Sequence, residues 1–131
     1  MSHYSKVNLN KVEDSAAKYG HGDNHEARFV TKSLSLTKAG MSLQKLLPGK
    51  RSPFGHKHTT QEEILVVIAG SGRMKLDDKI IKLKPYDAVR IPPGTMQACV
   101  AGSKGMEFII FGAPKLEERD FEITKGWWPS G

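Results

Sequence analysis

The chain has little of what marks a secreted, membrane-bound or disordered protein. It has one cysteine, Cys99, in 131 residues, so no internal disulfide can form. No apolar run approaches the roughly 20 residues of a membrane-spanning helix, and the first residues lack the basic-then-apolar plan of a signal peptide. The hydrophobic content of 38% and charged content of 26% are typical of a folded globular chain. We therefore expect a cytoplasmic protein that does not enter a membrane.

Basic residues are in excess, but they are not concentrated in runs. The chain has 20 lysines and arginines against 14 acidic residues, a net charge of +6. No basic run is interleaved with aromatic residues, as nucleic-acid-binding segments often are, and the lysines of residues 79–84 follow two aspartates. We expect no nucleic-acid partner, and we interpret the charge as suited to a small anionic ligand.

Long helical periodicity and sequence repeats are both lacking after residue 28. Residues 1–27 form a polar N-terminal arm with one helical turn expected within 12–18. Residues 28–131 then show short apolar or alternating segments separated by glycine and proline turns, which indicates one all-β sandwich or barrel domain with a C-terminal tail. The expected strands are residues 29–31, 33–37, 41–47, 56–58, 63–68, 73–76, 79–83, 88–91, 96–101 and 106–111.

Two apolar features bear on assembly. Residues 64–68 are apolar at every position, as in a strand that is covered on both faces. A second sheet, the N-terminal arm or a partner subunit can supply the cover, and we expect a homodimer. Trp127 and Trp128 lie in the tail, where we expect them to pack over a barrel end or subunit seam; lining a ligand mouth is the alternative.

His56 and His58 are the first sign of a specific chemistry. Side chains two residues apart point to the same face of a strand, so both imidazoles can reach one ion. A carboxylate follows at the start of an apolar strand, from Glu62 or Glu63, and periodicity alone does not choose between them. Two histidines and one carboxylate are a common ligand set for divalent transition metals. Two ordinary polar residues at a barrel rim are the alternative interpretation.

Additional residues at fixed spacings complete a family pattern. The stretch from His56 to Gly70 follows the motif G-x5-H-x-H-x3,4-E-x6-G, with Glu63 as its carboxylate. Pro92 and Gly94 match G-x5-P-x-G-x2-H-x3-N. Over about residues 41–112 the chain thus resembles the cupin superfamily. The resemblance implies an antiparallel jelly-roll barrel, or double-stranded β-helix, with a metal inside.

The chain departs from both motifs. Lys50 and Tyr86 stand where each motif begins with glycine, and Ala101 replaces the final asparagine. Most important, Gln97 stands where cupins place a third histidine ligand, and an amide oxygen is a weaker donor than imidazole. Three interpretations remain open: a facial triad with Gln97 as weak ligand or substrate donor, a weak site filled by available zinc or nickel, or a pocket for an organic ligand without metal.

Strand parity and the resemblance suggest a substrate pocket. Leu65 and Val67 share the face of Glu63, and Cys99 shares the face of Gln97. The candidate pocket residues are Met41, Phe54, Leu65, Val67, Arg90 and Cys99, with Arg90 as a holder of an anionic group. Cys99 is interpreted first as a small buried hydrophobe.

The resemblance implies a range of functions and does not name a substrate. We expect a divalent transition metal (Fe, Mn, Zn or Ni) held by His56, His58 and Glu63, with Gln97 as a weak ligand or none. The protein then acts on a small, anionic organic molecule in a dioxygenase-like or an isomerase- or lyase-like reaction. The alternative is a non-catalytic module that binds a small molecule or a metal. The sequence contains no convincing acid–base pair beyond these ligands.

Overall fold

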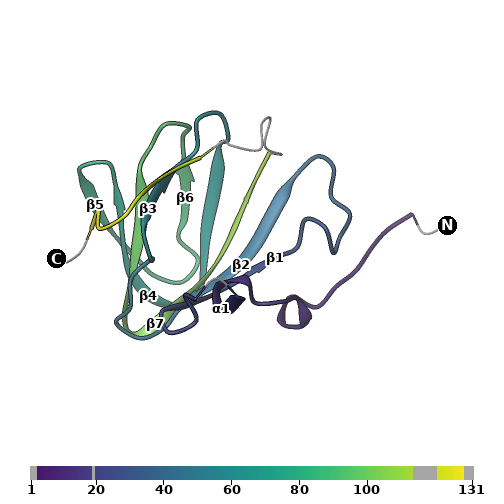
Figure 1. The fold of residues 1–131 in the computed structure, drawn as a ribbon, viewed down its shortest axis with the longest axis horizontal. Coiled ribbons are helices and arrows are strands. Elements are labelled where there is room, and N and C mark those ends of the chain that lie inside the picture. Colours follow the sequence, from purple (N-terminus) through teal and green to yellow (C-terminus); the bar gives the residue numbers. More distant parts are fainter. Residues whose placement is uncertain (1–2, 19, 114–120, 129–131) are drawn as a thin grey trace.

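A computed structural model describes residues 3–18, 20–113 and 121–128 of the chain. Eight strands form one antiparallel sheet that curls onto itself (Figure 1). The described helical segments are short: a 3-10 turn at Leu9–Lys11 and α1 at Ser15–Lys18. The latter confirms the helical turn expected within residues 12–18. None of the helices in the described ranges has the length and apolar character needed to cross a membrane.

The strands follow an order that places the two longest ones at the centre. They are β1 (His25–Phe29), β2 (Gly40–Leu46), β3 (Gly55–Lys57), β4 (Glu63–Leu76), β5 (Lys79–Leu83), β6 (Ala88–Ile91), β7 (Gln97–Gly112) and β8 (Glu122–Thr124). The sheet runs β1-β2-β7-β3-β8, and β4 pairs with β5, β6 and β7. This antiparallel, all-β barrel confirms the expected fold class.

Strands β4 and β7 bend where the sequence predicted turns. Residues 69–72 and 102–105 were expected to separate two strands each, which is wrong, because both segments stay in the sheet. The β4–β7 register shifts at residues 67–69 and 70–72, so bulges curve the pair without ending it. Gly70 has a φ of +73°, and a Cβ there would lie 2.1 Å from the Gly105 carbonyl oxygen. Only glycine permits this approach.

Other strand predictions failed outside the central strands. Residues 33–37 form turns rather than a strand, because the amides of Leu34, Ser35 and Leu36 donate to carbonyls of residues 30–32. Strand β8 was not expected; it has three residues and pairs with β3. Strand β1 begins at His25, inside the segment assigned to the arm. The division into arm and barrel remains a prediction.

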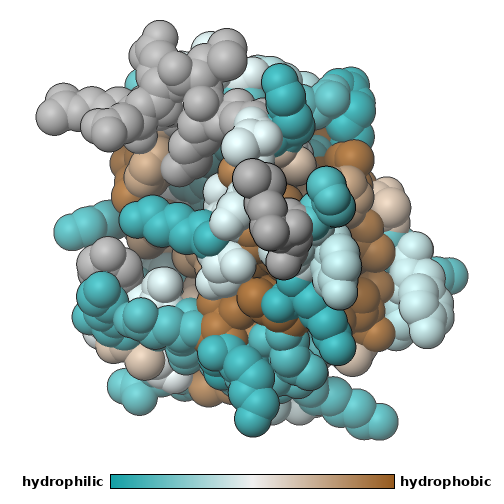
Figure 2. Space-filling model, turned by 90° about the vertical axis from the view of Figure 1, so that its right-hand side faces the viewer, coloured by the Kyte–Doolittle hydropathy of each residue, from teal (hydrophilic) through white to brown (hydrophobic). Residues whose placement is uncertain are grey.

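The core lies between the curled halves of the sheet. Leu65, Val67 and Met74 of β4 are fully buried, and they join one cluster with residues of β2, β5, β6 and β7. The alternate positions of β4, Ile64 and Val66, are half-buried. Apolar surface also reaches the face of the molecule seen in Figure 2. The expected homodimer, which would cover such surface, stays a prediction.

Candidate metal centre

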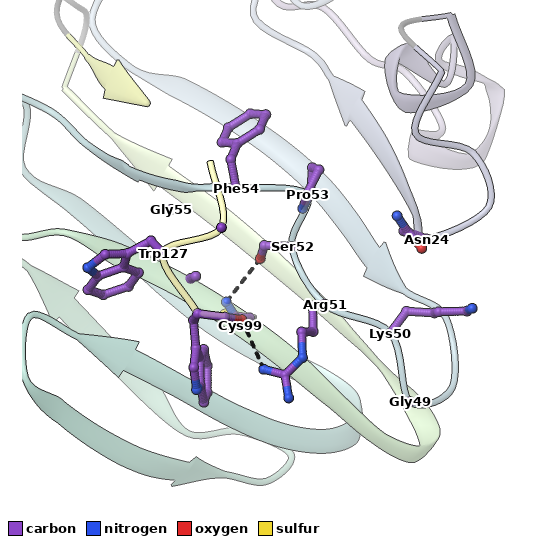
Figure 3. Close-up of a pocket in the computed structure, with 13 residues that line it drawn as sticks. Asn24, Gly49, Lys50, Arg51, Ser52, Pro53, Phe54, Gly55, Cys99 and Trp127 are labelled. Atoms are coloured by element: carbon purple, nitrogen blue, oxygen red, sulfur yellow. Dashed lines mark hydrogen bonds between the residues drawn. The ribbon is translucent and has the colours of Figure 1, made fainter. Parts of the chain in front are cut away.

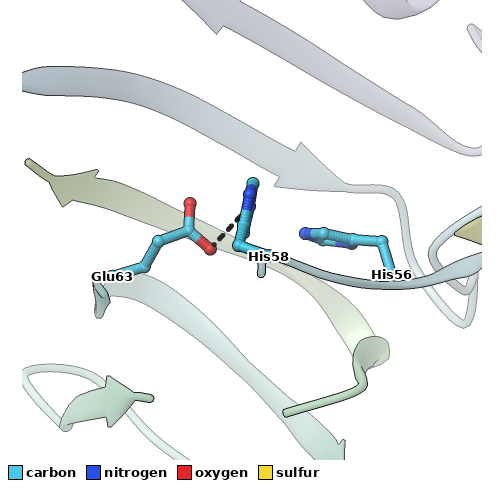
Figure 4. Close-up of side chains that lie close together, drawn as sticks. All are labelled: His56, His58 and Glu63. Atoms are coloured by element: carbon cyan, nitrogen blue, oxygen red, sulfur yellow. Dashed lines mark ion pairs between the residues drawn. The ribbon is translucent and has the colours of Figure 1, made fainter. Parts of the chain in front are cut away.

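Three potential metal ligands converge at one end of the barrel. His56 lies in β3 opposite Gln97 of β7, His58 directly follows β3, and Glu63 begins β4. One ligand atom from each of His56, His58 and Glu63 lies within 4.8 Å of the others. Figure 4 shows the two imidazoles and the carboxylate gathered in front of the curled sheet.

Hydrogen bonds fix the position of the Glu63 carboxylate. This residue is 9% exposed, and His58 Nε2 lies 3.2 Å from its Oε1 (Figure 4). The Gln97 amide Nε2 donates to the same Oε1 at 3.1 Å. An ionised carboxylate only accepts hydrogen bonds, so the glutamine presents its nitrogen and not its oxygen. In this geometry Gln97 holds the carboxylate of the candidate ligand Glu63 from the neighbouring strand.

The electrostatic surroundings of Glu63 favour its charged form. Burial acts to raise the pKa of this carboxyl, but the hydrogen bond and charge of His58 lower it. The charge of His56 and the hydrogen bond from Gln97 add to this effect, and the net pKa lies below the usual value. Glu63 is therefore an anion at neutral pH, which suits a metal ligand and not a general acid.

The backbone around the site explains one of the motif matches. The Gly94 amide donates to the His58 carbonyl oxygen at 2.7 Å, and Gly94 has a φ of +83°. The Pro-Pro-Gly turn thus holds the end of the histidine segment. On the other side, the Gln61 side chain donates to the Ala113 carbonyl at 2.5 Å. These two contacts brace the loop that joins β3 to β4.

Aromatic rings flank the histidines. The rings of His56 and His58 lie 5.3 Å apart at 88°, and Phe54 approaches His56 edge-on at 6.3 Å. Phe121 lies 6.2 Å from His58. The sequence provided no signal for Phe121, because it follows a charged segment far from the motif and belongs to no expected strand. Such packing restricts the orientation of both imidazoles.

The predicted pocket residues are distributed between the interior and the surface. Leu65 and Val67 are fully buried in the core cluster, and Cys99 is 5% exposed within it. Burial raises the pKa of the Cys99 thiol to about 12, so it is a neutral thiol at physiological pH. These three residues form the apolar interior of the barrel.

The other pocket residues do not join the triad from the inside. Arg90 forms a 2.9 Å ion pair with Glu62, and both side chains are more than half exposed. Met41 pairs with Phe111, which in turn pairs with the outward-facing Ile64. The structure thus brings neither Arg90 nor Met41 to the triad. Phe54 contacts His56 and also lines a separate cavity.

The donor set fits a divalent transition metal. Metal–nitrogen and metal–oxygen bonds of about 2.1 Å place two ligands of one ion about 3 to 4 Å apart. The 3.2 Å between His58 Nε2 and Glu63 Oε1 meets this requirement. Because all three ligand atoms lie within 4.8 Å of one another, they need to move only slightly closer together to bind one ion. Two imidazoles and one carboxylate suit Fe, Mn, Zn or Ni, but they do not distinguish among them.

Fold and site together define a small jelly-roll barrel with a two-histidine, one-carboxylate group near one end. A family model described as the cupin domain matches residues 42–111. The chain therefore belongs to the cupin family.

Individual proteins are also similar to this chain. An uncharacterized protein of Methanocaldococcus jannaschii is 33% identical over 71 residues, which are 53% of this chain and 57% of that protein. The match thus spans little more than half of this curated relative. A cupin protein from Bacteroides fragilis superposes with a TM-score of 0.70 and 25% identity over 90% of this chain and 89% of its own.

A sugar phosphate isomerase of the cupin superfamily from Silicibacter pomeroyi has a similar structure. Its TM-score is 0.72 at 19% identity, over 92% of each chain. At this level of identity the likeness shows the fold alone.

Proposed function

We propose that this cupin binds a divalent transition metal through His56, His58 and Glu63 and acts on a small anionic organic molecule. The observation that supports this most directly is the convergence of the three ligand atoms within 4.8 Å. A metal bound there would act as a Lewis acid toward oxygen atoms of the substrate.

The residues around the triad have separate tasks in this proposal. Gln97 is 3% exposed and holds the Glu63 carboxylate through its amide, as supporting residues of metal sites commonly do. Leu65 and Val67 are buried on the same face of β4 as Glu63 and form an apolar surface from which water is excluded. Such a surface strengthens the attraction between the triad and a cation.

The proposed reaction is an isomerisation or an elimination. The alternative is a dioxygenase-like, oxygen-dependent cleavage. A sugar phosphate isomerase shares this fold, and a net charge of +6 favours an anionic substrate through long-range attraction. Glu63 is assigned as a ligand because its lowered pKa makes it a poor proton donor.

A second candidate function is metal or small-molecule binding without catalysis. The buried polar side chains of the described residues are Ser42, His58, Gln61, Glu63 and Gln97. Of these, only His58 and Glu63 titrate, and both belong to the triad. Outside the triad, the ionisable side chain that is fully buried in the described part of the chain is the Cys99 thiol, which burial keeps neutral, and this favours a binding module.

Elemental analysis of purified protein, loaded with Fe, Mn, Zn or Ni in turn, tests the metal site. We expect about one ion per chain with the preferred metal and a strong loss in His56→Ala. The matched control is His3→Ala, which removes an exposed histidine and should leave the metal content unchanged. Equal loading of both variants would contradict the assignment of His56.

Activity measurements then separate an enzyme from a binder. Metal-loaded protein is incubated with a panel of sugar phosphates, diols, catechols and keto acids, and turnover is followed by proton NMR and oxygen consumption. Turnover that is lost in His56→Ala supports the enzyme. Ligand binding at full affinity to metal-free protein, with no turnover, would refute it. Light scattering at the same concentration measures the mass and tests the proposed homodimer.

A further inference from the structure

A cavity lies between the tail and strand β7. Its volume is about 380 Å³, and its walls are the segment 49–55, strand β7 and the tail at residues 126–128. Figure 3 shows Arg51, Phe54 and Trp127 around it, above the ribbon of β7. The size falls in the range of about 300 to 1,000 Å³ that is typical of small-molecule pockets. The three metal ligands are not among its lining residues.

Flat aromatic faces form one part of this cavity. Trp127 is pressed against β3, because a Cβ on Gly55 would lie 2.7 Å from Trp127 Cε3. Trp128 is 8% exposed and packs on Ala98 and Val100 of β7. Phe54 adds a third ring to the lining. Lys75 Nζ lies 4.5 Å from the centre of the Trp127 ring, and the Arg73 guanidinium lies 5.6 Å from that of Trp128. The indoles are thus held rigidly, and a ligand ring can contact the parts of them that stay exposed.

Cationic and hydrogen-bonding groups form the other part. The Arg51 guanidinium lies 5.3 Å from the centre of the Trp128 ring, and its Nη1 donates to the Trp128 carbonyl at 3.2 Å. A guanidinium has five N–H donors, so others remain for a ligand. Lys50 also lines the cavity. None of the described lining residues is acidic, so the local charge is positive.

A serine hydroxyl adds a directional group. Ser52 Oγ accepts a hydrogen bond from the Cys99 amide at 2.9 Å, which fixes the oxygen at the cavity wall. Its own hydrogen can then be donated to a bound anion. A lining that combines aromatic edges, two cations and a hydroxyl is complementary to a flat ring that bears a negative group.

We propose that this cavity is a second binding site, separate from the metal centre, for small anions built on a flat ring, such as aromatic phosphates or carboxylates. The inference does not depend on the proposed metal site. Phe54 touches both places, since its ring lies 6.3 Å from His56, so the test must be made with and without metal.

The two tryptophans of the chain, Trp127 and Trp128, both line the cavity, and they report on it directly. Tryptophan fluorescence and the two indole N–H signals in a proton–nitrogen NMR spectrum are followed during titration of the full chain. The probes are phenyl phosphate, benzyl alcohol (ring only) and inorganic phosphate (charge only). We expect phenyl phosphate to bind about ten-fold or more tightly than either of the other two, with both indole signals shifted.

Variants assign the binding to this cavity. Lys50→Gln removes an exposed cation and should weaken phenyl phosphate binding about three-fold or more, while its control Lys32→Gln, an exposed lysine on the β1–β2 connection, should not. Phe54→Leu should weaken phenyl phosphate but leave inorganic phosphate unchanged. A circular dichroism melt of each variant shows that it is folded.

Three outcomes would overturn the inference. The first is an absence of any indole shift with phenyl phosphate. The second is equal affinity for phenyl phosphate and benzyl alcohol, which indicates unspecific apolar binding. The third is loss of binding in chelator-treated wild-type protein, which places the ligand at the metal. Retained binding after chelation supports the second site, even if the proposed metal function fails.

Discussion

Replacing Gln97 by leucine tests whether this residue supports Glu63. The substitution keeps most of the volume but removes the amide that donates to Glu63 Oε1 at 3.1 Å. A hydrogen bond to a charged group is worth about 1.5 to 3 kcal/mol, whereas a neutral one is worth about 0.5 to 1.5 kcal/mol. Gln97→Leu should therefore lower the free energy of unfolding of metal-free protein at pH 7 by about 2 kcal/mol.

Gln44 offers a matched control. Its amide also donates over 3.1 Å, but to the neutral hydroxyl of Ser42. Gln44→Leu should therefore cost about 1 kcal/mol. Urea denaturation of both variants and the wild type, followed by circular dichroism in the presence of a chelator, gives the two differences.

The pH dependence provides the sharper readout. The pKa of Glu63 is lowered in the folded protein, so its charge stabilises the fold above the unfolded pKa, and this contribution is lost as pH falls through the folded pKa. Without Gln97 one of the causes of that lowering is gone. The cost of Gln97→Leu should thus shrink toward acid pH, while that of Gln44→Leu should not, because burial lowers the pKa of His25 whereas the hydrogen bond of Gln44 acts to raise it and so favours the charged form of His25. A pH-independent cost for Gln97→Leu, or one no larger than that of the control, would refute the role assigned to this residue.

Three additional predictions concern the barrel itself. Gly70→Ala should cost about 4 kcal/mol or more, because its Cβ would meet a backbone oxygen at 2.1 Å, whereas Gly49→Ala, with a similar positive φ and open space, should cost about 1 to 2 kcal/mol; similar costs in urea denaturation would contradict the close approach. Cys99 should react only slowly with a thiol reagent, because its side chain is 5% exposed and its pKa is raised to about 12, and rapid labelling of folded protein would argue against this. Leu65→Ala, at a fully buried site, should cost about 2 to 5 kcal/mol, and Ile80→Ala, at a 49% exposed one, clearly less; thermal melts that shift equally would count against the core assignment.

Local patterns predicted several strands of the barrel. Alternation and glycine or proline punctuation located β2, β5 and β6 to within about a residue or two, as expected for segments that bury one face. They failed at the bends of β4 and β7, because a glycine in a bulge and a glycine in a turn look the same in sequence. They also failed at residues 33–37, where alternation of serine and leucine has no pairing partner.

Candidate site residues could be predicted only as far as spacing along the chain extends. His56, His58 and Glu63 lie within eight positions of one another in the sequence, so the spacing of the motif could predict that they converge, as they do in the structure. Arg90 was proposed for a substrate anion, but the structure pairs it with Glu62 on the outer surface. The pairing of β4 with β6 places Arg90 opposite the outward-facing Ile64. Strand parity predicts the outward position of Arg90 only when this pairing is known.

The sequence by itself determined the all-β class, the family and the three candidate ligands, because these depend on residue type and short-range spacing. The role of Gln97 and the cavity beneath Trp127 were decided only by the tertiary structure. The Gln97–Glu63 hydrogen bond joins residues 34 positions apart, and the Arg51–Trp128 contact spans 77. Contacts over such separations depend on how the sheet curls, and side-chain chemistry read along the chain contains no record of that curvature.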